Sequence, residues 1–194
     1  MKKSNRHLVE YYKITADNPP SKLLIKALGF VKNKNKAIDI GGGALKDTKY
    51  LLDQGFNVNV VDKSELMAIE AKKILSKKIH YAVSAFANFD FPENTFDLAA
   101  AMYSLSFNPP ETFIGVIEKI KKSLVQGGIF CGQLFGVRDE WSNSKEMTFL
   151  TKIQVQELFS DMEIISFEEE DADGTIANGT KKHWHVFHII AKKV

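Results

Sequence analysis

The sequence predicts an α/β protein: a Rossmann-like, doubly wound sheet of seven strands, mostly parallel, with an antiparallel last strand. Short apolar runs alternate with helical patterns through the first two thirds of the chain, which favours parallel strands joined by helices. A glycine turn over residues 41–43 follows the first apolar run, and Asp62 ends the second. The last third holds two alternating segments with no helical pattern between them, as expected for an antiparallel pair.

Residues 1–35 are expected to form an N-terminal helical cap. The segment Asn18-Pro-Pro-Ser21 is typical of a helix start, and apolar residues at helical spacing follow it until Gly29. The polar stretch before this helix contains an aromatic pair, Tyr11 and Tyr12.

Residues 36–136 are expected to form the core of the sheet. The pattern predicts strands over residues 37–40, 56–61, 79–83, 96–103 and 129–135, and helices over residues 44–54, 64–75 and 108–124. The run 96–103 is apolar apart from one acid, which is typical of a strand buried on both faces. Right-handed crossovers between successive strands make these five strands parallel.

Residues 137–194 are expected to extend the sheet with an antiparallel pair. After a polar loop and a helix over residues 152–159, the pattern predicts strands over residues 163–167 and 183–191. A polar link containing Gly174 and Gly179 joins them, and the acidic run 168–171 is interpreted as a solvated strand end. The whole chain, residues 1–194, is expected to form one domain.

The composition is that of an ordinary globular protein, with 44% hydrophobic residues, 26% charged residues and a net charge of +2. Nucleic-acid and membrane-surface partners are not expected, because no concentrated basic face is present. No apolar run is long enough to span a membrane. The single cysteine, Cys131, cannot form an internal disulfide, which fits a reducing cytoplasmic location. Nothing in the sequence indicates an oligomeric state.

The glycine turn and Asp62 together indicate a nucleoside cofactor. Glycines let the backbone turn sharply and approach a ligand where a Cβ would clash. Asp62 lies 21 positions after Gly41, and an acid at the tip of the second strand can accept hydrogen bonds from both ribose hydroxyls. This element alone does not say which nucleoside cofactor binds.

Four segments resemble the class I S-adenosylmethionine-dependent methyltransferases, in the expected order over residues 36–136. Ala37-Ile-Asp-Ile-Gly-Gly-Gly43 is similar to their first motif, and Val60-Val-Asp62 to the strand that ends in their ribose-binding acid. Phe91-Pro-Glu-Asn-Thr-Phe-Asp97 resembles the entry to their fourth strand, and Leu124-Val-Gln-Gly-Gly-Ile-Phe130 the segment before their fifth. The paired tyrosines and paired prolines of the N-terminus are most similar to the small tellurite-resistance and thiopurine type.

The resemblance implies that S-adenosylmethionine is the cofactor, bound by residues 36–136, and that the last strand inserts beside the fifth. It implies that Asp39 orients the glycine turn or helps to hold the cofactor amine, and that Asp62 holds the ribose. Residues 85 and 86 would lie along the adenine, and residues 102 and 103 would face the reactive end. The implied cofactor-binding residues are Asp39, Gly41, Gly42, Gly43, Asp62, Lys63, Ala85, Phe86, Met102 and Tyr103.

Two departures from the family pattern bear on the cofactor. Leu45 stands where the last glycine of the motif is usual, and Ala85 stands where an acid often reads the adenine amino group. Two alternatives therefore stay open: a nicotinamide-dependent oxidoreductase, and a non-catalytic nucleoside-binding protein with a degraded pocket. Against the oxidoreductase, Lys46 stands where a dinucleotide fingerprint needs a glycine.

The resemblance implies a methyltransferase whose partner is a small-molecule methyl acceptor. Tyr11, Tyr12 and Trp141 are candidate residues of the acceptor pocket. No catalytic residue is assigned, because a sulfonium is already an activated leaving group and a base is needed only if the acceptor must lose a proton. His183 and His185 share a strand face, but no third ligand is identifiable, and no metal is predicted.

Overall fold

The fold, given by a computed structural model, is built on one seven-stranded sheet in the order β3-β2-β1-β4-β5-β7-β6. The structure describes residues 3–194, with side chains from residue 7 onward. The strands are β1 (Lys36–Ile40), β2 (Asn57–Asp62), β3 (Ile79–Val83), β4 (Phe96–Ala101), β5 (Leu124–Phe135), β6 (Met162–Thr175) and β7 (Lys181–Lys193). The helices are α1 (Lys3–Thr15), α2 (Lys22–Leu28), α3 (Lys46–Asp53), α4 (Glu65–Ala71), α5 (Pro110–Ser123) and α6 (Lys152–Leu158), with short 3-10 turns η1 (Phe86–Asn88) and η2 (Leu105–Phe107).

The pairing of the strands confirms the predicted topology. Strands β1 to β5 pair with one another in parallel, whereas β7 is antiparallel both to β5 and to β6. The antiparallel last strand therefore lies beside β5, as the sequence predicts.

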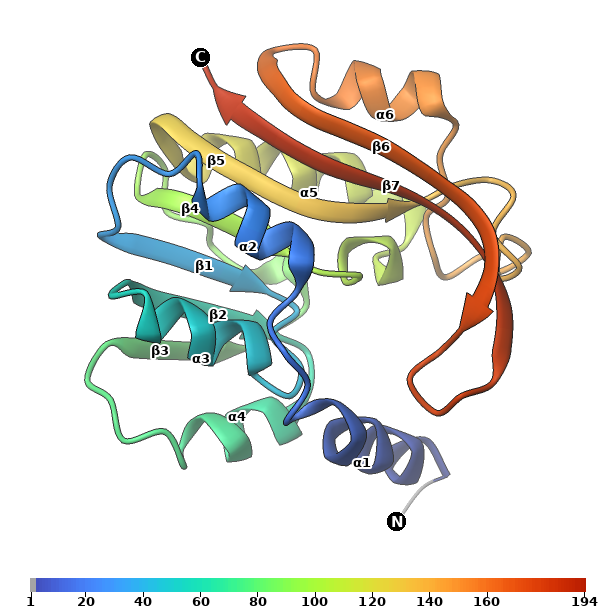
Figure 1. The fold of residues 1–194 in the computed structure, drawn as a ribbon, viewed down its shortest axis with the longest axis horizontal. Coiled ribbons are helices and arrows are strands. Elements are labelled where there is room, and N and C mark those ends of the chain that lie inside the picture. Colours follow the sequence, from blue (N-terminus) through green and yellow to red (C-terminus); the bar gives the residue numbers. More distant parts are fainter. Residues whose placement is uncertain (1–2) are drawn as a thin grey trace.

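Helices cover both faces of the sheet, as the doubly wound prediction requires. In Figure 1, α2 and α3 lie in front of the sheet and α5 lies behind it. Leu24 and Leu51 belong to the apolar layer under α2 and α3, whereas Phe113 and Ile117 belong to the layer under α5. With both faces covered, the carboxyl ends of the central strands are the natural ligand site.

Strand β4 is buried on both faces, as its apolar run predicts, but it is shorter than expected. All six of its residues are buried. The predicted strand runs to Tyr103, whereas the observed strand ends at Ala101, because Tyr103 adopts a left-handed backbone conformation with φ of 53°. This bend turns the chain out of the sheet at its carboxyl edge.

Helix α4 is also shorter than the pattern predicts. Ser64 caps it as expected, since its side chain accepts a hydrogen bond from the Leu66 N–H. The helix ends at Ala71 instead of continuing to Leu75, which is fully exposed and therefore has no apolar surface to hold it in a helix.

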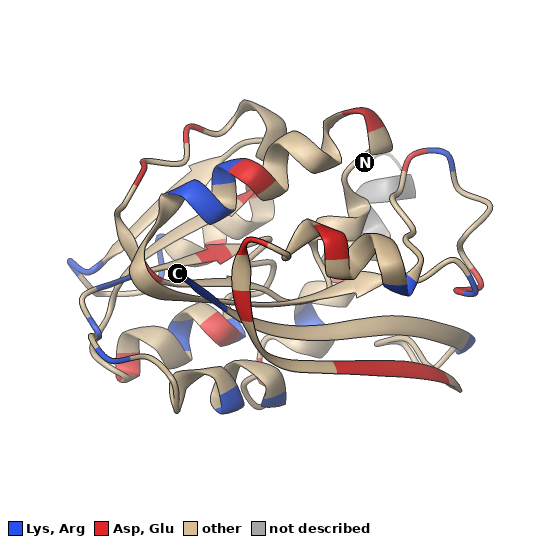
Figure 2. Ribbon diagram, turned by 90° about the horizontal axis from the view of Figure 1, so that it is seen from above, with Lys and Arg blue, Asp and Glu red and all other residues tan. Residues whose placement is uncertain are grey.

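The C-terminal hairpin is much longer than predicted. The segment interpreted as a polar link is largely paired strand, and only residues 176–180 connect β6 to β7. The interpretation of the acidic run 168–171 as a strand end is wrong. It lies in the middle of β6, the strand at the edge of the sheet. Figure 2 shows it as a continuous acidic stretch along that strand.

Cations on neighbouring elements explain how so acidic a strand can pair. Lys26 of α2 lies 2.6 Å from Glu168, and Arg138 contacts Asp171 at 2.5 Å and Glu169 at 2.8 Å. These partners are remote in sequence, so a local pattern cannot reveal them. Charges along an edge strand also discourage pairing with a further strand.

Within residues 3–194, no helix is both long enough and apolar enough to cross a lipid bilayer.

The register of β4 and β5 leads to a stability prediction at Gly132. A Cβ on Gly132 would lie 2.8 Å from the carbonyl oxygen of Ala101, which belongs to the neighbouring strand and cannot move aside freely. We expect Gly132→Ala to lower the free energy of unfolding in urea by about 1–3 kcal/mol. In Gly115→Ala, within α5, the added Cβ would have no neighbour within 4 Å, so we expect a gain of about 0.5–1 kcal/mol. Equal stability of the two variants would contradict this register.

Candidate functional site

The turn after β1 passes so close to its neighbours that two of its residues must be glycines. Gly41 has φ of 81°, and a Cβ there would collide with Ser104, which follows β4. A Cβ on Gly42 would collide with the side chain of Val60 on β2. The Ser104 hydroxyl also donates a hydrogen bond to the carbonyl of Ile40, at the end of β1. The turn is thus held between β4 and β2.

Gly43 differs from the other two glycines, because a Cβ there would collide with no neighbour. Its φ is 48°, and the nearest atoms to a Cβ at this position, the Gly41 carbonyl oxygen and Tyr11 Cε1, would both be 3.9 Å away. Packing within the chain therefore does not require a glycine here. A backbone without a side chain that packing does not demand is suited to the close approach of a ligand.

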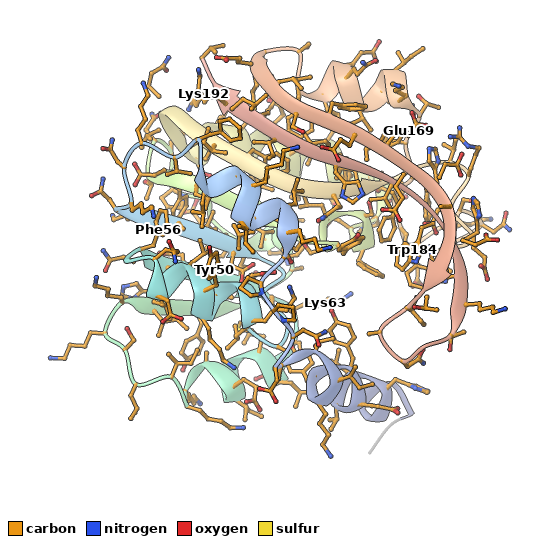
Figure 3. All side chains as sticks on the ribbon, viewed as in Figure 1. Tyr50, Phe56, Lys63, Glu169, Trp184 and Lys192 are labelled. Carbon is orange, nitrogen blue, oxygen red and sulfur yellow. The ribbon has the colours of Figure 1, made fainter. Side chains whose placement is uncertain are left out.

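Asp62 fixes the orientation of this bare backbone. Its Oδ2 accepts a hydrogen bond from the Gly43 N–H at 3.0 Å, and its Oδ1 accepts one from the Ser64 N–H at 2.9 Å. A carboxylate offers about four lone-pair directions, so each oxygen retains capacity for a further donor. Lys63, the next residue, is exposed, and Figure 3 shows it between the end of β2 and α1.

Asp39 lies beneath the turn, with only 2% of its surface exposed. Its carboxylate accepts a hydrogen bond from the Thr48 hydroxyl at 2.5 Å. Burial, and then the charge of nearby Asp47, raise the pKa of Asp39 to about 7. A cationic partner placed beside this buried acid would stabilise its ionised form.

Leu45 does not obstruct the turn. Its backbone is left-handed, with φ of 66°, where a glycine would be unstrained, but its side chain is completely buried in the apolar layer that contains Leu51 and Val60. The cost of the left-handed backbone, about 1–2 kcal/mol, is offset by the burial of a whole leucine side chain. The departure from the family glycine is thus accommodated inside the core, away from the open side of Gly43.

Phe86 and Ala85 border the same turn from the segment after β3. The end of the Phe86 ring would lie 3.4 Å from a Cβ on Gly41. Ala85 is exposed and precedes η1, so it offers backbone groups in place of the missing acidic side chain.

The two tyrosines of α1 have different surroundings. Tyr11 is half-exposed beside Gly43, and burial and the charge of Asp62 raise its pKa. Tyr12, in contrast, is only 7% exposed and packs in the apolar layer. Its hydroxyl has no hydrogen-bond partner among the described side chains, and burial, with a smaller contribution from Asp62, raises its pKa to about 12.

A second group of side chains, which we call the aromatic wall, lies on the other side of Ser104. The ring centroid of Tyr103 lies 5.7 Å from that of Trp184 and 6.3 Å from that of Phe135. Trp141 lies 5.7 Å from Trp184 and 6.1 Å from Phe107. The aromatic wall consists of Tyr103, Phe107, Phe135, Trp141 and Trp184. Figure 3 shows Trp184 on the side of the β6–β7 hairpin that faces the centre of the molecule.

A buried ion pair supports the aromatic wall from within. The Lys182 ammonium lies 2.5 Å from Asp139 Oδ2, and both side chains are almost fully buried. The same ammonium lies 3.6 Å from the ring centroid of Trp184 and 4.3 Å from that of Trp141. Because removing either partner would strand a buried charge, this pair fixes both indoles in place.

The structure therefore gathers the predicted site residues into two adjacent groups. The turn group is Asp39, Gly41, Gly42, Gly43, Asp62, Lys63, Ala85 and Phe86, with Tyr11 beside it. Tyr103 and Trp141 belong to the aromatic wall. Met102 is half-buried and packs against the apolar layer under α2 and α3.

Sequence reasoning missed four polar residues that organise these groups: Thr48, Ser104, Gln133 and His188. Thr48 and Ser104 hold the turn as described, and the Gln133 side chain accepts the Tyr103 N–H at 3.2 Å. His188 contacts Tyr103 edge-on. None of the four carries a local signal, since each acts on a residue from a different element.

The two histidines that invited a metal hypothesis are bonded to acids of β6 instead. His183 contacts Asp171 at 2.8 Å and Asp173 at 2.7 Å, and buried His185 contacts Glu169 at 3.1 Å. Among residues 7–194, no cluster of three or more His, Cys, Asp or Glu side chains is arranged to hold a metal ion.

Comparison with known proteins shows what this arrangement is similar to. Residues 37–128 match the family model described as "Methyltransferase domain". A search of curated protein sequences gives no significant match. TehB from Haemophilus influenzae has a similar structure, with a TM-score of 0.75 and 18% identity over 88% of this chain, which spans only 61% of TehB.

Two further structures with the same fold were solved with S-adenosylhomocysteine bound. One is the 1,6-didemethyltoxoflavin-N1-methyltransferase of Burkholderia thailandensis, with a TM-score of 0.65, 18% identity and coverage of 89% of this chain and 79% of that one. The other is the N-methyltransferase NodS of Bradyrhizobium japonicum, with a TM-score of 0.70, 14% identity and coverage of 97% of both chains. Identities this low show a shared fold and no more.

The match of residues 37–128 to a methyltransferase domain and the shared fold agree with the four sequence segments that resemble the class I S-adenosylmethionine-dependent methyltransferases. The resemblance predicted from the sequence is thereby confirmed, and the match to TehB is consistent with the predicted small type.

The buried Asp39 leads to a prediction about stability and pH. Its pKa is higher in the folded protein than in the unfolded chain, so the folded state binds more protons and loses stability as pH rises from about 4 to about 7. We expect Asp39→Asn to raise the free energy of unfolding at pH 8 by about 1–3 kcal/mol, since one pKa unit corresponds to about 1.4 kcal/mol. At pH 4 the effect should nearly vanish.

Urea denaturation at the two pH values measures this effect. Asp90→Asn is the matched control, because Asp90 is exposed. A gain of equal size at pH 4 and pH 8 would show that it does not come from the ionisation of Asp39.

Proposed function

We propose that the protein transfers a methyl group from S-adenosylmethionine to a small molecule. The observation that carries this proposal is the open, left-handed backbone at Gly43, held beside the Asp62 carboxylate. It is supported by the match of residues 37–128 to a methyltransferase domain.

The residues at the turn fit the parts of this cofactor. Asp62 would accept hydrogen bonds from the ribose hydroxyls with the lone pairs that Gly43 and Ser64 leave free. The methionyl part would lie against Gly43, above the buried Asp39, whose raised pKa a cationic amine would lower again. Phe86 and the backbone of Ala85 would border the adenine. Lys63 would lie at the solvent side of the ribose.

The cofactor supplies a methyl group on a positively charged sulfur, which is an activated leaving group. The protein then needs mainly to align the acceptor and to exclude water. Tyr11 would cover the turn from α1, and Tyr103 and Trp141 would border the acceptor. Tyr103 is not suited to act as a base, because burial and the charge of Glu170 raise its pKa to about 12.

A small acceptor is in keeping with two proteins of the same fold, whose names specify an N1-methyltransferase of 1,6-didemethyltoxoflavin and an N-methyltransferase. The proposal includes a cytoplasmic location, which the lone buried Cys131 supports.

The region at the start of α3 argues against a nicotinamide dinucleotide. A pyrophosphate would need bare N–H groups at this helix start. Instead, the Asp47 carboxylate accepts hydrogen bonds from the Ser21 N–H and hydroxyl, each at 2.7 Å, and Lys46 contacts the same group. A buried acid at this position would repel phosphate.

Calorimetry with S-adenosylhomocysteine and with NAD tests the proposal. We expect the first to bind and the second not to bind. Binding of NAD alone would support an oxidoreductase, and binding of neither would support a protein with a degraded pocket.

Gly43 provides a second prediction, because the protein without ligand has room for a Cβ at this position. We expect Gly43→Ala to cost only about 1–2 kcal/mol of stability, from its left-handed backbone, but to weaken S-adenosylhomocysteine binding at least tenfold. Gly42→Ala should instead destabilise the fold, because its Cβ collides with Val60. Calorimetry and urea denaturation of both variants separate the two effects. Undiminished binding by a folded Gly43→Ala variant would remove Gly43 from the site.

Asp62 provides an independent prediction. We expect Asp62→Ala to weaken S-adenosylhomocysteine binding by about 2–3 kcal/mol, because two hydroxyls lose a charged acceptor and the Gly43 N–H loses its anchor. Asp90→Ala, at an exposed position, should leave the dissociation constant unchanged. An unaltered constant in Asp62→Ala would rule out the ribose assignment.

A further inference from the structure

The aromatic wall presents exposed aromatic surface next to the bare turn. Tyr103 is 40% exposed, and its neighbour in the chain, Ser104, touches the turn at Gly41. Phe107 is similarly exposed, and Trp141 and Trp184 are half-buried. A cluster of exposed rings at the carboxyl edge of the sheet is a surface on which a flat, apolar molecule can pack.

An ionisable pair, His188 and Glu170, adjoins this surface. The His188 ring meets the Tyr103 ring edge-on, with centroids 6.4 Å apart. Its Nε2 lies 3.0 Å from Glu170 Oε2. A carboxylate only accepts hydrogen bonds, so Nε2 donates to Glu170, and in the neutral imidazole Nδ1 then carries the lone pair. Within residues 7–194, no hydrogen-bond partner is found for Nδ1.

The other charged groups near His188 are already paired. Glu168, on the same strand as Glu170, lies 2.6 Å from Lys26 of α2. Lys182, the cation within the aromatic wall, is bound to Asp139. Tyr103 faces the ring from the end of β4 as a neutral phenol. The wall therefore offers neither a free cation for an anionic acceptor nor an acid other than Glu170, which His188 engages.

We propose that the acceptor is a planar aromatic molecule with an acidic O–H, S–H or N–H, that it packs on the aromatic wall, and that His188, oriented by Glu170, removes its proton. This inference rests on the proposed function and adds to it the acceptor class and the base.

The proposed step is balanced without any further reactant. The acceptor's heteroatom forms a bond to the methyl carbon, and the carbon–sulfur bond breaks with its electron pair going to sulfur. The acceptor's proton goes to Nδ1 of His188, and the Glu170 carboxylate stabilises the resulting imidazolium.

The first test is a binding measurement that does not depend on turnover. The chain has two tryptophans, and both belong to the aromatic wall, so intrinsic fluorescence reports on this surface. We expect 4-nitrophenol and 4-nitroanisole to quench it saturably, and cyclohexanol to have no effect. Tyr103→Leu should weaken 4-nitrophenol binding about three- to tenfold. Tyr81→Leu is the matched control, because Tyr81 is 38% exposed but lies on β3. Equal effects of the two substitutions would overturn the proposal.

The second test follows the proton. The phenolate of 4-nitrophenol absorbs at a longer wavelength than the phenol, so bound probe can be examined at a pH where the free probe is mostly protonated. We expect wild-type protein to bind it largely as phenolate, and His188→Gln and Glu170→Gln to reduce the phenolate fraction at least threefold. His80→Gln, at an exposed position on β3, should match wild type. An unchanged phenolate fraction in a folded His188→Gln or His188→Asn variant would refute the role of His188.

These outcomes are distinguishable from failure of the proposed function. S-adenosylhomocysteine binding measured on the His188 and Glu170 variants reports on the turn and on folding, since neither residue belongs to the turn. Loss of nucleoside binding by wild type would reject the methyltransferase proposal, whatever the phenol measurements show. Nucleoside binding without binding of 4-nitrophenol would reject only the acceptor class.

Discussion

The site depends on one steric constraint: β1 must turn between Ser104 and Val60 with no room for a side chain. Gly41 and Gly42 satisfy this constraint, because a Cβ on either would collide with a neighbouring strand segment. With the turn held between these two side chains, the next residue, Gly43, directs its N–H toward Asp62, and a Cβ on Gly43 would meet no atom closer than 3.9 Å. The same local geometry thus serves packing at two positions and ligand approach at the third.

The end of β4 connects the glycine turn to the aromatic wall. Ser104 binds the Ile40 carbonyl, and the residue before it, Tyr103, takes a left-handed conformation that the Gln133 side chain stabilises by accepting its N–H. Left-handed tyrosine is unfavourable, and such strain is concentrated at functional sites. Here it turns the Tyr103 ring toward Trp184, so that the glycine turn and the aromatic wall share one support at the end of β4.

The fold and the turn could be predicted from sequence because their determinants are local. Apolar runs predict β1 to β5, and the three glycines after β1 predict the tight turn beside Asp62. The long β6–β7 hairpin could not be predicted, because acids in the middle of a strand are tolerated only with cations such as Lys26 and Arg138, which come from distant elements. The burial of Tyr12 and the exposure of Tyr11 likewise depend on how α1 lies on the rest of the chain, as does the position of Tyr11 beside Gly43.

Residues that act across elements escape sequence reasoning for the same reason. Thr48, on α3, donates a hydrogen bond to Asp39 on β1. His188 contacts Tyr103 because the antiparallel strand β7 places it beside the end of β4. Leu45 shows the converse: its sequence position suggests an obstructed turn, whereas its side chain is enclosed in the core.

A crystal structure of the protein with S-adenosylhomocysteine is the most direct test of the central claim. We expect the ribose hydroxyls within hydrogen-bond distance of the Asp62 carboxylate and the homocysteine backbone against Gly43, with the sulfur facing Tyr103. Density for the nucleoside elsewhere on the molecule, or an Asp62 side chain turned away from it, would contradict the account.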